Sequence, residues 1–298
     1  MNTRFRGLGV AVVTPFKYDK SVDHENLAGL VESLIAGGVD YLVALGTTSE
    51  TPTLNESEKE AVLRTIIRAN AGRLPVVMGL GGPCTNDILE KFDCFDFTGV
   101  DAILSVTPYY NKPSQEGLYE HYSEIAYHSP RPIILYNVGH RTACNLEFET
   151  TMRLAERYEK IIAIKEASGN MNQIMKLVKH KPEGFLVISG DDALTLPLLS
   201  IGIDGLVSVV ANAFPRHYSQ IVHLAFNGDF AEARRWHDDI LDLTQACFKE
   251  GNPAGIKAIL TMQQKIEYHL RLPLTRISQT LADEYKKLML NLKCEYHG

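Results

Sequence analysis

A lysine at the end of an apolar segment is the side chain with the clearest chemical potential in this sequence. Lys165 follows Ile161–Ile164, the most apolar strand candidate of the chain. Removing a lysine from water disfavours its ammonium form, and a neutral amine can attack a carbonyl group and form a Schiff base. The structural alternative, given equal weight at this point, is a lysine that reaches solvent or pairs with Asp191 or Asp192. The adjacent Glu166 must point to the other face of the strand, where we expect a structural role.

Three further segments place polar side chains directly after strand candidates. Tyr136 ends a neighbouring strand, and its phenol could move the protons of imine formation, because adjacent strands lie about 4.8 Å apart. Thr47 and Thr48 follow a glycine in a turn whose hydroxyl and N–H groups could hold a small carboxylate. Arg141 could clamp a carboxylate through two hydrogen bonds. Each has a structural alternative: a satisfied hydroxyl at a sheet rim, a capped turn and a solvated loop arginine.

The elements that must position these residues follow from the hydrophobic pattern. Short apolar runs rich in β-branched residues predict strands that are buried on both faces, as in a parallel sheet. These runs are Gly9–Val13, Tyr41–Leu45, Pro75–Met78, Ala102–Val106, Ile133–Tyr136, Ile161–Ile164, Phe185–Ile188 and Gly205–Val209. Helical periodicity lies between them, for example in the apolar stripe Leu27, Leu30, Val31, Leu34 and Ile35. Asn55 and Glu58 have the spacing of a capping box at a helix start.

This alternation predicts an α/β fold, a (β/α)8 TIM barrel with a C-terminal helical extension. We expect the barrel catalytic domain over residues 1–226 and the extension over residues 227–298, with helices at Phe230–Phe248, Ala254–Glu267 and Thr280–Leu292. A doubly wound open sheet is the alternative, but no glycine-rich nucleotide loop follows the first strand. Barrel enzymes gather catalytic groups at the carboxyl ends of their strands, which is where the polar segments described above lie.

Composition excludes several other classes of function. The chain has 298 residues, of which 22% are charged, with a formal net charge of −6. No run is rich in lysine and arginine, so no nucleic-acid partner is predicted. The longest uncharged stretch, Leu74–Asn86, is too short to cross a membrane. The ten histidines include no HxH or HExxH pair, so no metal site is predicted. The five scattered cysteines predict no disulfide framework and a reducing, cytoplasmic location.

Several motifs, taken together and in order, resemble the dihydrodipicolinate synthase (4-hydroxy-tetrahydrodipicolinate synthase) family of pyruvate-dependent class I aldolases. They are Gly46–Glu50, Thr107–Pro113, Tyr136–Val138 with Arg141-Thr142, and Ile164–Gly169. Asn252-Pro253 and Leu270–Leu274 are similar to the helical tail of the family, so the resemblance spans the whole chain.

The resemblance implies a condensation of pyruvate with L-aspartate 4-semialdehyde in lysine and diaminopimelate biosynthesis. Lys165 would form an imine and then an enamine with pyruvate, and Tyr136 would be the proton donor and acceptor. The enamine would attack the aldehyde, and cyclisation would follow. The family uses no metal or organic cofactor, and it is usually a homotetramer built as two dimers.

The remaining roles are also implied by the resemblance alone. Thr47 and Tyr110 match a proton relay to solvent, with Tyr110 lent across a dimer interface. Thr48 and Val207 match positions that bind pyruvate, and Arg141 matches the residue that receives the carboxylate of the semialdehyde.

Two alternative functions remain open at this point. N-acetylneuraminate lyase and other 2-keto-acid aldolases share the lysine and the tyrosine, so these two residues do not exclude them. Arg141 and Tyr110 favour the synthase, because the arginine suits a second carboxylate and the tyrosine completes the relay. A non-catalytic ligand-binding relative is the other alternative, although a binder would not need the lysine–tyrosine pair.

The sequence departs from the family pattern at several positions. Ser49 and Ala143 stand where the family usually has glycine, and Gly139 stands where it usually has proline. A serine in a turn that requires positive φ would cost about 1 kcal/mol. In lysine-sensitive relatives a histidine and an asparagine bind the inhibitor, and the matching positions here are Glu56 and Pro83, with Lys59 nearby in place of a second histidine. We therefore expect weak or absent inhibition by lysine.

Overall fold

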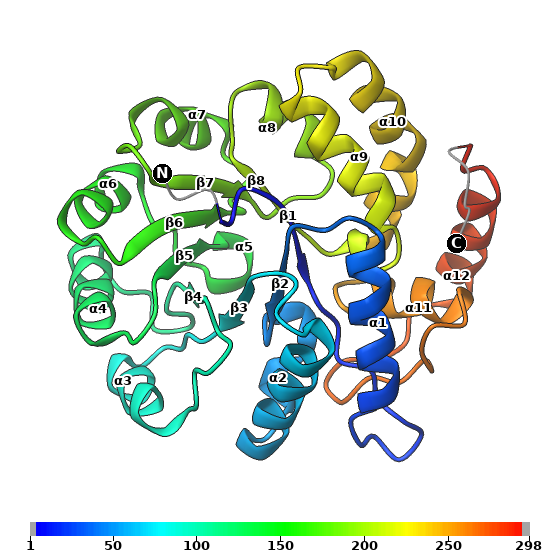
Figure 1. Cartoon of the computed structure of the whole chain (residues 1–298), viewed down its shortest axis with the longest axis horizontal. Helices are drawn as coiled ribbons and strands as arrows, with labels where there is room; N and C mark the ends of the chain where they lie inside the picture. Colours follow the sequence, from blue (N-terminus) through cyan, green and yellow to red (C-terminus); the bar gives the residue numbers. More distant parts are fainter. Residues whose placement is uncertain (1–3, 294–298) are drawn as a thin grey trace.

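The strands form a closed parallel barrel in the computed structural model, which describes residues 4–293 (Figure 1). The strands run in chain order around the barrel: β1 (Gly7–Ala11), β2 (Tyr41–Ala44), β3 (Val76–Gly79), β4 (Ala102–Val106), β5 (Ile133–Asn137), β6 (Ile161–Glu166), β7 (Leu186–Ser189) and β8 (Gly205–Ser208). The barrel closes where β1 pairs with β8, with Gly7 beside Gly205 and Gly9 beside Val207. The predicted TIM barrel is therefore confirmed.

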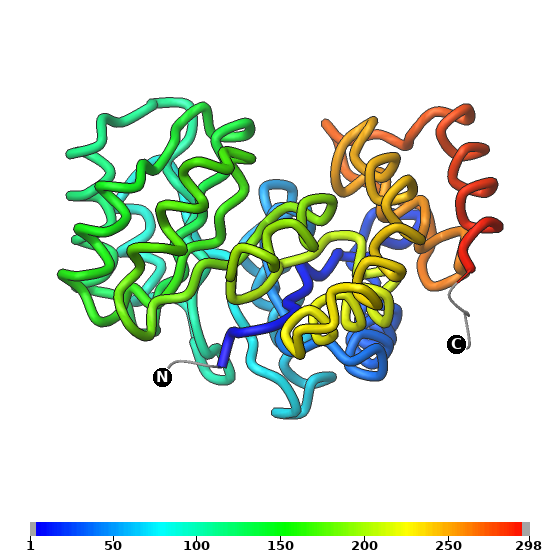
Figure 2. Tube along the Cα trace, turned by 90° about the horizontal axis from the view of Figure 1, so that it is seen from above, coloured from blue at the N-terminus to red at the C-terminus, as the bar shows by residue number. Residues whose placement is uncertain are grey.

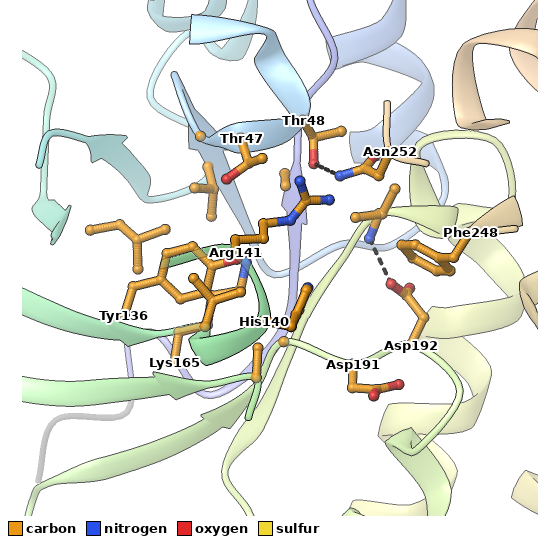
Figure 3. Close-up of a pocket in the computed structure, with 18 of the residues that line it drawn as sticks. Thr47, Thr48, Tyr136, His140, Arg141, Lys165, Asp191, Asp192, Phe248 and Asn252 are labelled. Atoms are coloured by element: carbon orange, nitrogen blue, oxygen red, sulfur yellow. Dashed lines mark hydrogen bonds between the residues drawn. The ribbon is translucent and has the colours of Figure 1, made fainter. Parts of the chain in front are cut away.

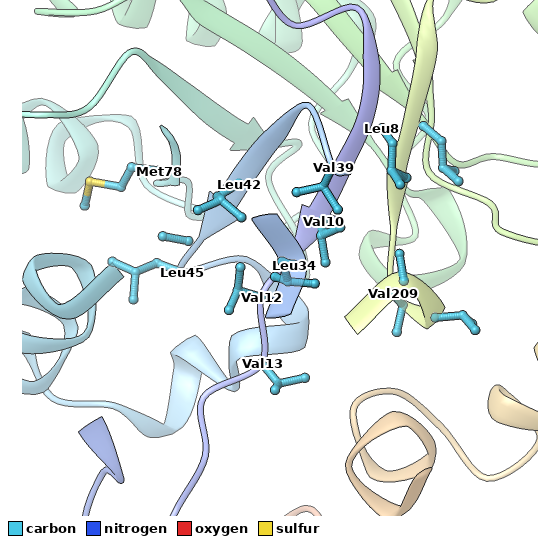
Figure 4. Packing of buried hydrophobic residues seen from close by; sticks show 14 of the residues in the cluster. Leu8, Val10, Val12, Val13, Leu34, Val39, Leu42, Leu45, Met78 and Val209 are labelled. Carbon is cyan, nitrogen blue, oxygen red and sulfur yellow. The ribbon is translucent and has the colours of Figure 1, made fainter. Parts of the chain in front are cut away.

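Side-chain alternation divides the apolar residues of the strands into two layers. In β5, Ile134 and Tyr136 join the cluster inside the barrel, whereas Ile133 and Leu135 join the larger cluster beneath the helices. Figure 4 shows part of this outer layer, where Val10 and Leu42 face Leu34 of the first helix. Because both faces of each strand are covered, a nearly continuous apolar run marks each strand in the sequence.

Helices follow the strands, and all of them except the short α5, which lies at the carboxyl end of β5, cover the outside of the barrel. They are α1 (His24–Ala36), α2 (Glu56–Asn70), α3 (Thr85–Cys94), α4 (Gln115–His128), α5 (Gly139–Thr142), α6 (Phe148–Arg157), α7 (Met171–His180), α8 (Thr195–Ser200) and α9 (Pro215–Phe226). The apolar stripe predicted for α1 is buried, apart from the partly buried Ile35. The predicted capping box is confirmed, because the Asn55 side chain accepts from the Glu58 N–H and the Glu58 side chain accepts from the Asn55 N–H.

The first strand begins and ends two residues earlier than the sequence predicts. Gly7 and Leu8 already pair with β8. The ladder ends because the N–H of Val13 donates to the side chain of Asn212, 3.1 Å away, instead of to a neighbouring strand.

The C-terminal extension comprises α10 (Phe230–Cys247), α11 (Ala254–Met262) and α12 (Gln279–Leu290). The prediction that the second of these helices reaches Glu267 is wrong, because Gln264 takes a left-handed conformation (φ +59°) that ends it. In Figure 2 the extension stands beside the barrel as one group of helices. We propose the domain boundary between residues 226 and 227, at the turn that joins α9 to α10.

The structure also bears on membrane-spanning helices and metal sites, neither of which the sequence predicts. Among residues 4–293, no helix has the length and apolar character needed to cross a membrane. In the same range, no cluster of three or more histidine, cysteine or acidic side chains has the arrangement of a metal site. Cys84, Cys94, Cys144 and Cys247 are free thiols, and Cys294 lies outside the described residues.

The seam that closes the barrel predicts a strong difference between two glycine substitutions. A Cβ atom at Gly205 would lie 2.2 Å from the carbonyl oxygen of Gly7, whereas one at Gly29 in α1 would meet nothing within 4 Å. Gly205→Ala should lower the thermal unfolding midpoint by about 2–12 °C, because overpacking costs about 1–3 kcal/mol and each kcal/mol shifts the midpoint by about 2–4 °C. Gly29→Ala should leave the midpoint unchanged or raise it slightly. Equal midpoints for the two variants would contradict this account of the seam.

Candidate active site

A cavity of about 380 Å³ opens at the carboxyl ends of the strands (Figure 3). The polar and aromatic side chains of its lining are Thr47, Thr48, Tyr136, His140, Arg141, Lys165, Asp191, Asp192, Gln245, Phe248 and Asn252. Five of the seven site residues predicted from the sequence thus meet in one place, although they come from the ends of three different strands, β2, β5 and β6.

Lys165 extends from β6 into this cavity. It shares the inward-facing side of the strand with Ala163 and is only 5% exposed. Tyr136 is its register partner on β5, and the Lys165 Nζ lies 4.3 Å from the centroid of the tyrosine ring. Within residues 4–293, the Lys165 Nζ forms no ion pair with Asp191 or Asp192. The alternative of a lysine paired with one of these aspartates is therefore not observed.

Two neighbours give the Lys165 side chain its space and direction. A Cβ atom at Gly190 would lie 2.8 Å from both the Ala167 Cβ and the Lys165 Cε, so a larger residue at this position after β7 would displace the lysine side chain or its neighbour. Glu166 points outward, as expected, and its carboxylate accepts hydrogen bonds from Asn137, Ser168 and Gln173 at 2.7–3.0 Å. The glutamate therefore anchors the end of β6, while the lysine on the opposite face stays available for chemistry.

The turn after β2 presents Thr47 and Thr48 to the same cavity. These residues begin a short 3-10 helix (Thr47–Ser49), and the Oγ1 of Thr48 accepts a hydrogen bond from the Asn252 side chain at 3.0 Å. Ser49 does not adopt positive φ; its hydroxyl donates to the Val12 carbonyl at 2.6 Å. The left-handed residue is Glu50, with φ of +56°, so the strain considered for Ser49 falls one residue later.

Arg141 lies on the short helix α5 that follows β5. Its guanidinium group points toward Thr48 and Asn252 in Figure 3. Ala143 caps this helix in the left-handed region, with φ of +54°. The alanine therefore stands at a position where glycine would be free of strain, and Arg141 is held by a turn that costs about 1 kcal/mol of backbone energy.

Two predicted site residues lie outside the lining of the cavity. Tyr110, in the loop after β4, is 95% exposed and has φ of +76°. Val207 is buried in the interior cluster of the barrel, and Val209 lines the cavity instead from the end of β8. Within the described chain, no hydrogen bond joins Tyr136, Thr47 and Tyr110 into the predicted relay.

The sequence reading did not assign a role to several residues at the cavity mouth. Gln245, Phe248 and Asn252 come from the end of α10 and the segment that precedes α11. Their only sequence signal was the family-like Asn252-Pro253, which was interpreted as part of the tail. The sequence offers Asp192 only as a possible partner of Lys165, and it gives no signal for His140 beyond its place next to Arg141.

A second cavity of about 370 Å³ adjoins the first and shares part of its lining. Thr47, Tyr136 and Arg141 line both cavities. The second cavity is also lined by Glu56, Lys59 and Lys91. The side chains of Glu56 and Lys59 form an ion pair at 2.8 Å. Pro83 does not line this cavity. The expectation of weak inhibition by lysine stays a prediction.

The comparisons with known proteins agree over nearly the whole chain. The dihydrodipicolinate synthetase family matches residues 4–292. A 4-hydroxy-tetrahydrodipicolinate synthase from Parabacteroides distasonis is 48% identical over 291 residues, which cover 97% of this chain and 98% of the relative. The chain belongs to the dihydrodipicolinate synthetase family. The family predicted from the sequence motifs is therefore confirmed.

Solved structures of dihydrodipicolinate synthases share this architecture. The pyruvate complex of the chloride-inhibited enzyme from Acinetobacter baumannii has a TM-score of 0.93 and 37% identity, covering 96% of this chain and 98% of that chain. A variant described as the first monomeric dihydrodipicolinate synthase has a TM-score of 0.94 and 37% identity, covering 97% of each chain. The chain thus has its backbone fold, over nearly its whole length, in common with enzymes of known structure.

Asp192 is the buried acid of the cavity wall, and it joins the ends of β7 and β8. Its carboxylate accepts hydrogen bonds from the Ser208 hydroxyl, the Val209 N–H at 3.0 Å and the Val210 N–H at 3.3 Å. Burial raises the pKa of Asp192 to about 6, although these hydrogen bonds oppose the shift. The native chain therefore retains a proton that the unfolded chain releases from its ordinary pKa of 3.8.

The raised pKa predicts a pH-dependent loss of stability. The contribution of the protonated Asp192 is fully present below about pH 4 and is lost as the pH rises through about 6, with a slope of at most about 1.4 kcal/mol per pH unit. In Asp192→Asn this contribution is absent. Thermal unfolding between pH 4 and pH 7 should therefore show the stability of the native chain falling relative to that of the variant. Parallel pH profiles for the two proteins would contradict the prediction.

Proposed function

We propose that this protein condenses pyruvate with L-aspartate 4-semialdehyde through an imine on Lys165. The activity predicted from the sequence, that of a 4-hydroxy-tetrahydrodipicolinate synthase, is confirmed by its relatives: the Parabacteroides distasonis enzyme carries that name at 48% identity over nearly the full length. The imine chemistry rests on one structural observation, the buried and unpaired Lys165 amine beside the Tyr136 ring. The Acinetobacter baumannii relative in complex with pyruvate supports the choice of keto acid.

The lysine–tyrosine pair accounts for the first half of the reaction. The neutral Lys165 amine attacks the keto carbon of pyruvate, the carbonyl oxygen leaves as water, and an imine remains. Loss of a methyl proton then gives the enamine. The Tyr136 phenol donates and accepts these protons, because it ends the adjacent strand at the same level as Lys165. A positioned general acid–base contributes about 10²–10⁴-fold to such steps.

The opposite wall supplies the groups that hold carboxylates. We assign the carboxylate of pyruvate to the turn with Thr47 and Thr48, and we retain Val207 as an apolar contact beneath it. We assign the carboxylate of the semialdehyde to Arg141, which crosses the mouth of the same cavity. The enamine carbon then attacks the aldehyde carbon, the aldehyde oxygen takes up a proton, and the amine of the semialdehyde closes the ring as Lys165 is released.

Tyr110 is assigned to a neighbouring copy of the chain. Its side chain is 95% exposed in the single chain, and the relative described as the first monomeric variant supports an oligomer as the usual state of the family. We propose a homotetramer built as two dimers, in which Tyr110 of one copy completes the Thr47–Tyr136 relay of another. We further propose a cytoplasmic location, which the free thiols support, and a reaction that involves neither a metal nor an organic cofactor.

Borohydride reduction tests the imine directly. With pyruvate present, the native protein should gain the mass of one reduced pyruvate adduct per chain, located on Lys165 by peptide mapping, and should lose its activity. Lys165→Ala should gain no adduct. Tyr136→Phe should still form the adduct, but with a rate about 10²–10⁴-fold lower, because the amine is retained and the proton carrier is lost. Absence of an adduct on the native protein would refute the mechanism.

Competition between aldehydes tests the acceptor. With saturating pyruvate, the native protein should prefer aspartate semialdehyde to N-acetylmannosamine, which is the acceptor that a neuraminate lyase uses in the synthetic direction. Arg141→Met should raise the KM for the semialdehyde at least about 10-fold, because a charge-assisted bidentate contact is lost. The pyruvate dependence of adduct formation should change much less. A preference for N-acetylmannosamine would overturn the assignment.

A further inference from the structure

A buried ion pair joins the C-terminal extension to the turn that carries Thr47 and Thr48. Lys257 of α11 donates to the carboxylate of Glu50, and both side chains have 0% exposure. Lys257 also donates to the His269 carbonyl at 3.1 Å, and its Nζ lies 4.1 Å from the centroid of the Phe16 ring. The second carboxylate oxygen of Glu50 accepts from the Arg271 N–H at 3.0 Å. The glutamate is thus held by two separate segments of the extension.

Glu50 in turn closes the threonine turn, which we define as Thr47–Glu50. Its N–H donates to the Thr47 carbonyl at 3.1 Å, and its own carbonyl accepts from the N–H and hydroxyl of Thr53. Its left-handed backbone is one that glycine would adopt without strain. A glutamate in this strained conformation indicates that contacts of its side chain, which a glycine lacks, hold the turn in place.

The same extension reaches the threonine turn at a second point. Asn252 donates to the Thr48 Oγ1, and the N–H of Lys257 bonds to the carbonyl of Pro253, the residue after Asn252. The asparagine and the lysine therefore belong to one rigid segment, separated by a single helical turn. This segment holds the threonine turn at Thr48 from the cavity side and at Glu50 from the buried side.

Stability alone does not explain a charged pair at this depth. Moving two charges out of water costs about as much as their attraction returns, and buried pairs can often be replaced by apolar residues without loss. Burial lowers the pKa of Lys257 to about 8, and the nearby Glu50 carboxylate opposes this shift, so Lys257 keeps its charge near neutral pH. The pair does fix the position of the Glu50 side chain, because an ion pair with these additional hydrogen bonds has one favourable geometry.

We propose that Lys257 and Glu50 are positioning residues that fix the threonine turn against Lys165, so that Thr47 and Thr48 hold the pyruvate carboxylate while the imine forms. This inference rests on the proposed imine mechanism. Neither residue touches the substrate: Lys257 acts through Glu50, and Glu50 acts through the backbone of the turn. Their loss therefore weakens the capture of pyruvate, and leaves the lysine chemistry and the binding of the aldehyde by Arg141 intact.

Pyruvate titration of the borohydride adduct separates this role from a purely structural one. In Lys257→Met, the pyruvate concentration that gives half-maximal adduct should rise about 10-fold or more, because a small displacement of the groups that bind it weakens capture. The adduct level at saturating pyruvate and the KM for the semialdehyde should stay within about twofold of the native values. Glu50→Asp, which retains the charge but withdraws it by one methylene, should show the same split to a smaller degree.

A double variant and a remote control complete the test. Lys257→Met with Glu50→Gln leaves no unpaired buried charge, so it should recover thermal stability relative to Lys257→Met while the weak pyruvate capture persists. Lys181→Met removes a partly buried ion pair with Asp204 ahead of β8, at the far end of the barrel from the cavity. That control should lower stability and leave the pyruvate titration unchanged.

The outcomes of this experiment are distinct from those of the proposed function. No adduct on the native protein refutes the imine mechanism and the inference together. A normal adduct on the native protein, with half-saturation within twofold of native in Glu50→Asp and in the double variant, refutes the positioning role alone. Should Lys257→Met fail to fold, as judged by circular dichroism, these two variants carry the decision.

Discussion

Closure of the barrel is the constraint on which every other feature of this molecule depends. Hydrogen bonds between β1 and β8 bring the first strand of the chain beside the last one, and the sheet then has no free edge. Once it is closed, the carboxyl ends of all the strands surround one opening. A strand-end residue therefore needs no long loop to reach the site. The closeness of Lys165 to Tyr136 follows from strand register alone.

Two-residue alternation then decides which side chains reach that opening. On β6 the inward face carries Ala163 and Lys165, and the outward face carries Glu166 with its three hydrogen-bond donors. The two charged neighbours thus occupy different environments, although a single peptide bond separates them. Glu166 is therefore engaged in hydrogen bonds that fix the end of the strand, whereas the Lys165 side chain extends into the cavity.

The barrel, and the placing of Lys165 and Tyr136 side by side at strand ends, were predictable from the sequence because both depend on the pattern of apolar strands. Strands covered on two faces are apolar throughout, and the polar residues that end them stand out against that background. The parts that were missed depend on long-range packing. Helix α11 ends because Gln264 adopts a left-handed backbone conformation, and no glycine or proline at this position marks the end in the sequence. Phe248 and Asn252 line the cavity only because the extension packs across its mouth. The strain assigned to Ser49 belongs to Glu50, because a turn's left-handed residue depends on its hydrogen bonds as well as on residue type.

The dependence of the site on Asn252 and Lys257 has a consequence for the order in which the protein matures. Chains emerge from the ribosome from the N-terminus, and each domain begins to fold as it emerges. The strands that carry Tyr136 and Lys165 are made well before the residues that hold Thr48 and Glu50. On the proposed mechanism, a nascent barrel has the Lys165 amine before it can orient a keto acid beside it. The positioning role proposed for Lys257 and Glu50 would then make catalysis begin only after the last helices have been synthesised and packed.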